Sequence, residues 1–325
     1  MTCRLLPALA LVCGLAAPAV AGTSYGVKSL SPGGTEVSVP PSVLFSFLDN
    51  GMTGVSVIGT ITRDSTQIDV DGLALSRTHG LLGFEITGTL AAPSSRLIAI
   101  DTGSATATVL GSSLAGRNIR GAMFDRQDRL WALDAAAGAL LRIDPVTGAV
   151  LSSTTITVGG VPRAISPGTD LVQRADGSIV LATYRFEEPD VSAPSFYALD
   201  LDTGAATLLF ADPVPDPFIA PVPIYVSGLA AGDEANPDLL QALDGDGTDD
   251  LLQYTLPSFA RVTRTGNFYP AFNAGGGDLA SLAPLDVPEP ASAALLGAGL
   301  AGMMLGRRRR QAGRPLCARE QESAS

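Results

Sequence analysis

The sequence predicts an all-β domain, a β-propeller of about five four-stranded blades, or six if one diverged unit is present. Two short phrases recur in the same order at intervals of roughly 50 to 60 residues, which is typical of propeller blades. No stretch of the body carries a sustained 3.6-residue apolar pattern, so we expect few helices. The two ends of the body also carry complementary parts of one unit. A β-sandwich is the alternative fold, but it does not explain those matched ends.

The first phrase is a glycine, an apolar residue and an alanine that open a short apolar run. Copies lie at residues 72–75 (GLAL), 121–124 (GAMF) and 228–230 (GLA). Residues 278–280 (DLA) lack the glycine, and residues 170–172 (DLV) are a weaker copy. Each copy is predicted to begin one unit.

The second phrase is an alternating strand that ends in aspartate and a Thr-Gly turn. It lies at residues 97–103 (LIAIDTG), 141–148 (LRIDPVTG) and 197–204 (YALDLDTG). Asp and Thr side chains can hydrogen-bond the turn backbone, and glycine accepts the positive φ that closes it. A further hairpin separates the two phrases, as at residues 125–133 and 174–180, so each unit is predicted to hold four strands.

The incomplete units lie at the two ends of the body. Residues 43–51 (VLFSFLDNG) resemble the second phrase without a first phrase before them, and residues 278–282 (DLASL) resemble the first phrase without a second after them. We therefore predict a closing blade that joins residues near 43–60 to a strand near 278–283. Such closure removes the open sheet edges at the ends of the ring.

Charge and cysteine usage limit the function classes. Residues 22–290 hold 14 basic and 30 acidic residues, a net charge of −16. This charge repels nucleic acid and anionic lipid, so neither is an expected partner. The three cysteines (Cys3, Cys13 and Cys317) lie outside this body, so no disulfide is expected in it and its stability must come from its core.

The first 21 residues form a predicted signal peptide. A short positive start at Arg4 precedes an apolar run, and residues 19–21 (AVA) form a small-x-small cleavage site. This order predicts export through the Sec translocon. The predicted organisation is a signal peptide at 1–21, the propeller at 22–286, a sorting tail at 287–310 and a short disordered tail at 311–325.

The C-terminal tail has three parts. Two prolines around a glutamate come first, then an uncharged apolar run over 291–306, and then four arginines. The run would rise roughly 24 Å as a helix, and the arginines favour the cytoplasmic side. The motif residues are Val287, Pro288, Glu289 and Pro290, and the cytoplasmic stop residues are Arg307, Arg308, Arg309 and Arg310.

This order resembles the PEP-CTERM sorting tail of Gram-negative bacteria. The resemblance implies an exosortase-type membrane protease as a partner, transient anchoring in the inner membrane, and release to the cell surface or the extracellular space. Fifteen residues follow the arginines here, at 311–325, where such tails usually stop almost at once.

Few residues suggest catalysis. The only histidine, His79, lies in a predicted turn, and one histidine cannot form a multi-histidine metal site. The body has no cysteine for thiol chemistry and no Gly-x-Ser-x-Gly motif. Trp131 is predicted to lie in the core. Asp71 and Asn118 are the polar residues nearest the expected channel mouth.

One acidic stretch, residues 244–252 (DGDGTDDLL), suggests a cation site. Asp244, Asp246 and Asp250 place carboxylates around two glycines, and calcium prefers six to eight oxygen ligands in a tightly turned loop. The stretch resembles the calcium loops of integrin-type FG-GAP propeller repeats, with Ala242 where the first carboxylate would stand. A plain solvated turn is the alternative, so no cofactor other than calcium is suggested.

Two function classes remain. The first is a surface or matrix protein whose propeller binds a ligand, such as exopolysaccharide or another surface protein, without catalysis. The second is a secreted propeller enzyme similar to a lactonase or a polysaccharide lyase, which would need polar residues at the channel mouth. The predicted inner-strand starts hold mostly Gly, Ala, Leu and Met, so the sequence favours binding.

Overall fold

The computed structural model describes residues 22–29, 41–48, 53–89, 91–165, 169–184, 194–211, 226–232, 236, 238–244, 251–264 and 277–282. The chain divides into two units, residues 1–284 and residues 285–325. All described residues belong to the first unit, so the fold below is that unit's alone.

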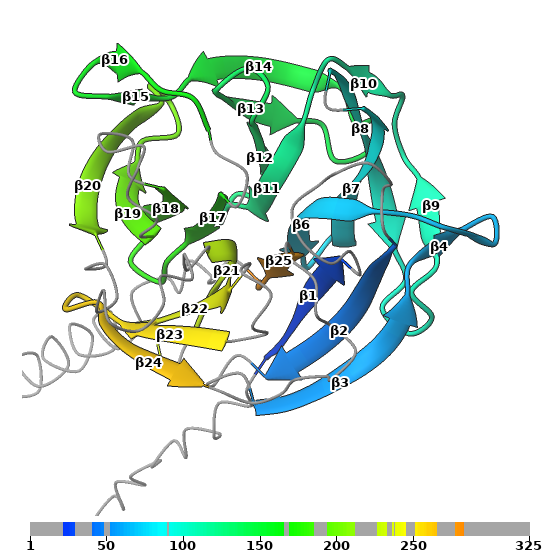
Figure 1. Cartoon of the computed structure of the whole chain (residues 1–325), viewed down its shortest axis with the longest axis horizontal. Coiled ribbons are helices and arrows are strands. Elements are labelled where there is room, and N and C mark those ends of the chain that lie inside the picture. Colours follow the sequence, from blue (N-terminus) through cyan, green and yellow to red (C-terminus); the bar gives the residue numbers. More distant parts are fainter. Residues whose placement is uncertain are drawn as a thin grey trace, which may run out of the picture. The chain divides into compact units, whose positions relative to one another are not determined.

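The described residues form five small sheets arranged in a ring, with no helix among them (Figure 1). Each sheet contributes one inner strand to the centre, and successive inner strands contact one another around the full circle. The inner strands are β6 (Val70–Ser76), β11 (Ile119–Phe124), β17 (Asp170–Gln173), β21 (Val226–Ala231) and β25 (Gly277–Ala280). The predicted five-bladed propeller is therefore confirmed, and the five copies of the first phrase are its five inner strands.

Blade 1 closes the ring with strands from both ends of the domain. Its order from the inside is β25, β1 (Thr23–Ser29), β2 (Ser42–Leu48) and β3 (Thr53–Thr60). The predicted join between residues near 43–60 and a strand near 278–283 is confirmed. The prediction missed β1, which pairs β25 on one side and β2 on the other. All the described strands of the ring lie within residues 23–280, in the first of the two units.

The other blades follow the chain in order. Blade 2 has β6, β7 (Gly80–Thr89) and β8 (Ala92–Ile100), with β9 (Ala107–Val109) and β10 (Leu114–Ala115) both on the outer edge of β8. Blade 3 has β11, β12 (Leu130–Asp134), β13 (Ala139–Ile143) and β14 (Val150–Thr155).

Blade 4 has β17, β18 (Ile179–Tyr184), β19 (Pro194–Leu199) and β20 (Ala205–Ala211), extended by β15 (Thr157–Val158) and β16 (Val161–Pro162). Blade 5 has β21, β22 (Leu239–Asp244), β23 (Leu251–Thr255) and β24 (Ala260–Arg264). A small hairpin of β4 (Thr62–Arg63) and β5 (Thr66–Gln67) joins blade 1 to blade 2.

The core consists of five apolar clusters, one between each pair of neighbouring blades. Adjacent residues of one strand serve opposite clusters, as Leu140 packs toward blade 4 and Leu141 toward blade 2. Neighbouring blades cover both faces of each blade, so its central strands consist almost entirely of apolar residues. In β12, for example, all five residues are buried. Trp131, in this strand, is 4% exposed and lies in the core as predicted.

The aspartate turns after the third strands behave as predicted in two of three copies. Asp144 and Asp200 each accept backbone N–H groups two and three residues further on, and Gly148 and Gly204 take positive φ. In the first copy the prediction placed the glycine wrongly. Gly103 is not the closing residue; Ala105 is, with φ 55°, and its N–H donates to the Asp101 carbonyl as those of the two glycines do to theirs.

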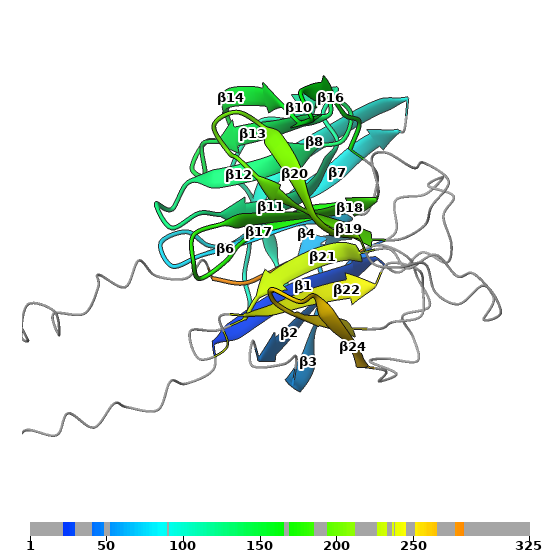
Figure 2. The same ribbon diagram turned by 90° about the vertical axis from the view of Figure 1, so that its left-hand side faces the viewer.

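The two faces of the ring can be named from the direction of the inner strands. The start face is where the inner strands begin, near Asp71 and Asp278; the finish face is where they end, near Ser76 and Ser281. Since β1 runs antiparallel to β25, β1 begins and β25 ends at the finish face (Figure 2). The strand ends connected by residues 30–40, 185–193, 212–225, 245–250 and 265–276 all lie on the start face.

Within the described part of the chain, no helix is long and apolar enough to span a membrane. The predicted signal peptide at 1–21, the apolar run at 291–306 and the tail at 311–325 lie outside the described residues.

Candidate functional site

The centre of the ring is built from one repeat position of each inner strand. Aligned by the first phrase, this position holds Gly72, Gly121 and Gly228 in three blades and Asp170 and Asp278 in the other two. A Cβ on Gly121 would lie 2.6 Å from Asp170 Oδ1, and one on Gly228 would lie 2.5 Å from the Leu279 nitrogen. Gly121 therefore leaves the space that the Asp170 carboxyl occupies, and Gly228 leaves room for the backbone of the closing strand β25.

Asp170 and Asp278 connect inner strands across the ring. The Leu229 N–H donates to Asp170 Oδ2 at 2.6 Å, and the Leu73 N–H donates to Asp278 Oδ2 at 2.5 Å. The other oxygen of each carboxyl accepts the N–H of the next residue in its own strand. The two carboxyls also hydrogen-bond each other, and both side chains are fully buried. This pair, Asp170 and Asp278, is called the axial pair below.

Two carboxyls that share a hydrogen bond in a buried site must hold a proton between them. Burial raises the pKa of Asp170 to about 8, although bonds from Asp278, Leu229 and Leu171 oppose the shift. Burial also raises the pKa of Asp278 well above its ordinary value, and the neighbouring charge of Asp170 adds to it. The axial pair therefore keeps at least one proton at neutral pH.

An ion pair flanks the axial pair at the start face. Arg120 Nη1 lies 2.9 Å from Asp71 Oδ2, and both side chains are 16% exposed. The charge of Asp71 contributes to the raised pKa of both axial carboxyls. Asn118 is the other predicted channel-mouth residue. Its backbone N–H donates a hydrogen bond to Asp134 Oδ1 at 3.0 Å.

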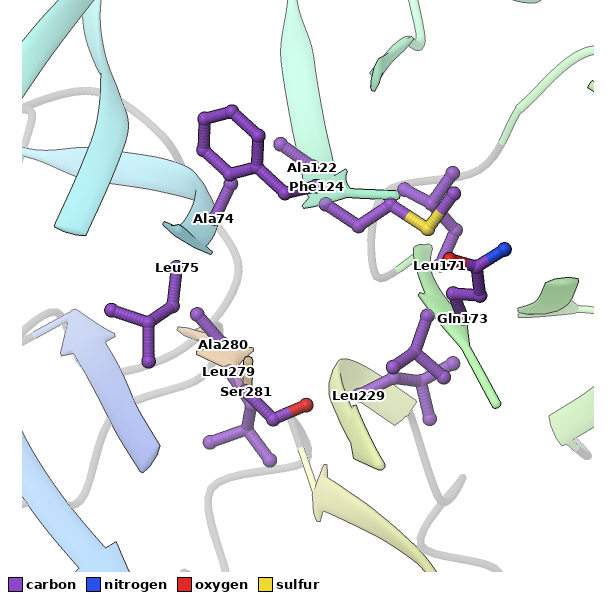
Figure 3. Close-up of a pocket in the computed structure, with 12 residues that line it drawn as sticks. Ala74, Leu75, Ala122, Phe124, Leu171, Gln173, Leu229, Leu279, Ala280 and Ser281 are labelled. Atoms are coloured by element: carbon purple, nitrogen blue, oxygen red, sulfur yellow. The ribbon is translucent and has the colours of Figure 1, made fainter. Parts of the chain in front are cut away.

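The finish end of the channel is apolar and narrow. The close-up in Figure 3 shows inner-strand side chains surrounding a hollow with room for about one water molecule. Its wall is formed by Ala74, Leu75, Ala122, Met123, Phe124, Leu171, Val172, Gln173, Leu229, Leu279, Ala280 and Ser281. The polar members Gln173 and Ser281 both accept bonds from neighbouring blades, from the N–H groups of Arg126 and Ala231. This end is suited to holding blades together rather than to binding a substrate.

His79 lies in the turn between β6 and β7, as predicted. Its ring stacks on Phe124 with centroids 5.8 Å apart, and its Nε2 lies 3.7 Å from Asp128 Oδ2. The Ser76 hydroxyl donates to Asp128 Oδ1 at 2.6 Å and accepts the His79 N–H. Because the carboxylate lies between serine and histidine, the histidine cannot take the serine proton, and the cluster joins blade 2 to blade 3.

Most of the predicted calcium loop lies outside the described residues. Asp246 and Asp250 lie outside the described residues, and only the backbone of Asp244 is described, as the last residue of β22. Among the side chains that are described, no group of three or more His, Cys, Asp or Glu could hold a metal ion. Since β22 ends at the start face, this loop begins on the same face as the Asp71–Arg120 pair.

Comparison with known proteins supports the sequence reading of the tail. Residues 286–310 match the family model of the PEP-CTERM protein-sorting motif. The motif residues 287–290 and the arginines 307–310 fall inside that match. No curated protein matches the chain as a whole.

Many solved structures resemble the domain at low identity. A protein of unknown function from Bacteroides caccae has 12% identity and a TM-score of 0.41, covering 76% of this chain and 74% of that one. The periplasmic gluconolactonase PpgL of Pseudomonas aeruginosa has 15% identity and a TM-score of 0.40, covering 77% and 69%. A nidogen/laminin complex has 10% identity and a TM-score of 0.46, covering 80% and 99%. These likenesses transfer no activity; the propeller assignment rests on the strand topology.

Sequence reasoning missed the axial pair, although the signal was present. Both aspartates stand where three other copies of the first phrase hold glycine. A carboxylate that replaces glycine at this repeat position indicates that its side chain contacts the neighbouring inner strands, as both aspartates do.

Proposed function

We propose that this chain is an exported protein, sorted by its tail to the cell surface or extracellular matrix, whose propeller binds a ligand without catalysing a reaction. The observation that carries the proposal is the PEP-CTERM motif at residues 286–310, which begins four residues after Leu282, the last described residue of the ring. An exosortase-type protease is the partner that this motif implies.

The position of the motif suits processing. The last strand of the ring, β25, ends at Ala280, and Leu282 still forms a bridge with Leu75 of blade 2. A cut near Pro290 would remove no strand and no described contact of the ring. The domain would therefore keep its fold when it leaves the membrane.

The start face is the candidate binding face. The four longest sequence segments between strands, residues 30–40, 185–193, 212–225 and 265–276, all connect strand ends there, and binding residues are disproportionately found on such connections. Leu282, the last described residue of the ring, lies at the opposite face. A net charge of −16 favours neutral or amino-bearing exopolysaccharide over an acidic one.

The enzyme alternative needs an acidic or amide side chain that substrate can reach in the channel. Asp170 and Asp278 are fully buried and hydrogen-bonded to backbone N–H groups, and Asp71 is paired with Arg120. These carboxylates therefore give that alternative no support.

The sorting part of the proposal is tested by the mass of the exported protein. We expect loss of residues 1–21 and of the segment after about Pro290 when the chain is produced in a host with an exosortase. Replacing Glu289 with alanine should leave the tail attached, whereas a Pro284→Ala control outside the motif should be processed normally. Exported protein that still contains Arg307–Arg310 would contradict processing.

The binding part is tested separately with purified residues 22–286. We expect co-sedimentation with neutral or amino-bearing exopolysaccharide from the host, and no hydrolysis or elimination product over the same period. Turnover of a lactone or a polysaccharide would instead support the enzyme alternative.

A further inference from the structure

Blade 2 has a hairpin that projects beyond the other described strands on the start side (Figure 2). Its strands β7 and β8 are the two longest that the structure describes, with ten and nine residues. Val70, the first residue of the inner strand β6, pairs with Glu85, and β7 continues for four more residues to Thr89. At about 3.3 Å per residue, these four residues rise roughly 13 Å past the level of the channel mouth. Residues 86–95, which form the projection, carry no charge.

An ion cluster lies at the foot of this hairpin, on the side that faces blade 1. Leu81 and Ile98 lie on the same side of β7 and β8 and pack in the apolar cluster that blade 2 shares with blade 1. Arg63 Nη2 lies 3.0 Å from Glu85 Oε1, and Arg96 Nη2 lies 2.6 Å from Glu85 Oε2. The Glu85 side chain is 4% exposed, whereas those of Arg63 and Arg96 are 27% and 24% exposed. One buried anion therefore lies beneath two cations that solvent reaches.

This cluster differs from other ion pairs that have a buried carboxylate. Among the described residues, Asp134 pairs with Arg117 alone, and Asp125 pairs with Arg129 alone. Glu85 pairs with two arginines, so this cluster holds one positive charge more than its buried carboxylate balances. The excess is notable in a body with a net charge of −16.

The two arginines also keep hydrogen-bond donors for a ligand. Asp64 Oδ2 lies 3.6 Å from Arg63 Nη1, but the Asp64 side chain is 89% exposed, so water screens this pair. Neither Arg63 Nη1 nor Arg96 Nη1 donates a hydrogen bond to a described residue. Guanidinium N–H groups bind carboxylates in a planar, often two-pronged geometry. One further carboxylate would therefore balance the charge and accept these donors.

Hydroxyl groups lie on the same side of the hairpin, further from the ring. Thr87 and Ser94 pair with each other two residues beyond the Glu85–Arg96 pair, so they face the same side about 7 Å away. Both residues are partly exposed, and Thr87 Oγ1 donates to the Ser94 carbonyl at 3.3 Å. Hydroxyl groups donate and accept hydrogen bonds, as the hydroxyl groups of a sugar do. The hairpin thus offers a cationic step and a hydroxyl step side by side.

We propose that this side of the β7–β8 hairpin binds an acidic sugar unit. Arg63 and Arg96 would bind the sugar carboxylate, and Thr87 and Ser94 would bind sugar hydroxyl groups. The proposal names a contact on the candidate binding face, and it rests on the proposed function only for the polymer to which the sugar belongs.

Charge limits the kind of polymer. The net charge of −16 acts against a densely acidic chain. Charges more than about 8 Å apart are largely screened at physiological salt, so the two arginines dominate once a sugar is in contact. A largely neutral or amino-bearing polymer with isolated uronic acid units satisfies both conditions.

The test is a ligand-observed NMR titration of the purified full chain, in a nonionic detergent, with D-glucuronate. We expect a Kd on the order of millimolar that rises with added sodium chloride. The methyl ester of glucuronate keeps the hydroxyl groups but has no charge, and acetate keeps only the carboxylate. Both should bind at least about tenfold more weakly than glucuronate. This comparison uses the unmodified protein, so it does not depend on the folding of any variant.

Variants assign the binding to this hairpin. Arg63→Gln should raise the Kd for glucuronate at least about tenfold, because it removes the excess cation and leaves Arg96 to hold Glu85. Thr87→Val should weaken the binding of glucuronate but not that of acetate. Arg129→Gln is the matched control and should leave the Kd unchanged, since Arg129 is a partly exposed arginine on a fully buried carboxylate at the finish face.

The proposal is overturned if the methyl ester or acetate binds as tightly as glucuronate. It is also overturned if folded Arg63→Gln protein keeps the original Kd, or if Arg129→Gln weakens binding equally. Co-sedimentation with exopolysaccharide that survives Arg63→Gln would overturn this site and leave the proposed function intact. Glucuronate binding without co-sedimentation would support the site and contradict the binding of that polymer.

Discussion

The two ends of the central channel hold the same five strands together by different means. At the start end the contacts are polar: the axial pair accepts N–H groups from two neighbouring inner strands, and Asp71 pairs with Arg120. At the finish end the wall is mostly apolar, with Leu75, Met123 and Phe124 among the lining residues. Hydrogen bonds in the first region fix distances, whereas packing in the second depends mainly on filled volume.

This difference indicates where the ring can tolerate change. An apolar wall accepts another side chain of similar volume at a cost below about 1.5 kcal/mol. A buried polar cluster cannot lose one partner without leaving another unsatisfied. We therefore expect substitutions at the start end to be more damaging than substitutions at the finish end.

The largest effect is expected for Gly228→Ala at the start end. Its Cβ would lie 2.5 Å from the Leu279 nitrogen and 2.8 Å from the Asp278 Cα, both on the closing strand. Because backbone atoms cannot move aside easily, we expect a loss of about 3 kcal/mol or more in the free energy of unfolding, measured by urea denaturation.

Gly80→Ala, at the finish face, is the matched control. Gly80 has φ +72° and no atom within 4 Å of the added Cβ, so only backbone strain of about 1–2 kcal/mol is expected. An equal loss in the free energy of unfolding for both variants would show that close backbone approach at the axis does not determine the cost of Gly228→Ala.

An intermediate effect is expected from pH. The folded pKa of Asp170 is about 8, far above that of an unfolded aspartate, so folding takes up a proton between about pH 4 and pH 8. The stabilisation is complete in acid and is lost as pH rises through the folded pKa. The free energy of unfolding should fall by up to about 1.4 kcal/mol per pH unit over that window.

Asp170→Asn should flatten this pH dependence, because it removes the carboxyl whose pKa is raised to about 8 by burial. Asp144→Asn is the control, since backbone N–H bonds lower the pKa of this exposed turn carboxyl. The stabilisation that the Asp144 carboxylate provides is lost only as pH falls through that lowered pKa. Asp144→Asn should therefore change the slope of the free energy of unfolding against pH only in acid. A slope between pH 5 and pH 8 that survives Asp170→Asn would exclude Asp170 as its source.

The smallest effect is expected from calcium at residues 244–250, which would place a second acidic feature at the start face. With Ala242 in place of a carboxylate, we expect a Kd on the order of 10⁻⁴ to 10⁻³ M. Millimolar calcium should then raise the melting temperature of residues 22–286 slightly, and Asp246→Ala should abolish the increase. Equal shifts in both proteins would indicate general screening of a surface with a net charge of −16.

The repeats made the ring predictable, because each inner strand and each third strand has its own sequence phrase. Residues 23–29 were missed because second strands have no shared phrase; they pack against neighbours that differ from blade to blade. Ala105 shows a similar limit, since a buried alanine replaces the expected glycine at a positive φ. The partnership of Asp170 with Asp278 depends on the order of blades around the axis, which no local pattern contains.

Closure by strands from both ends also affects how the protein is made. Synthesis proceeds from the N-terminus, so β1, β2 and β3 exist long before their partner β25. The ring stays open until residues 277–280 arrive, and the sorting motif follows within about ten residues. A chain that stops before Gly277 lacks both the means to close and the means to be sorted. A chain that carries the sorting tail has therefore already made the strand that closes its ring.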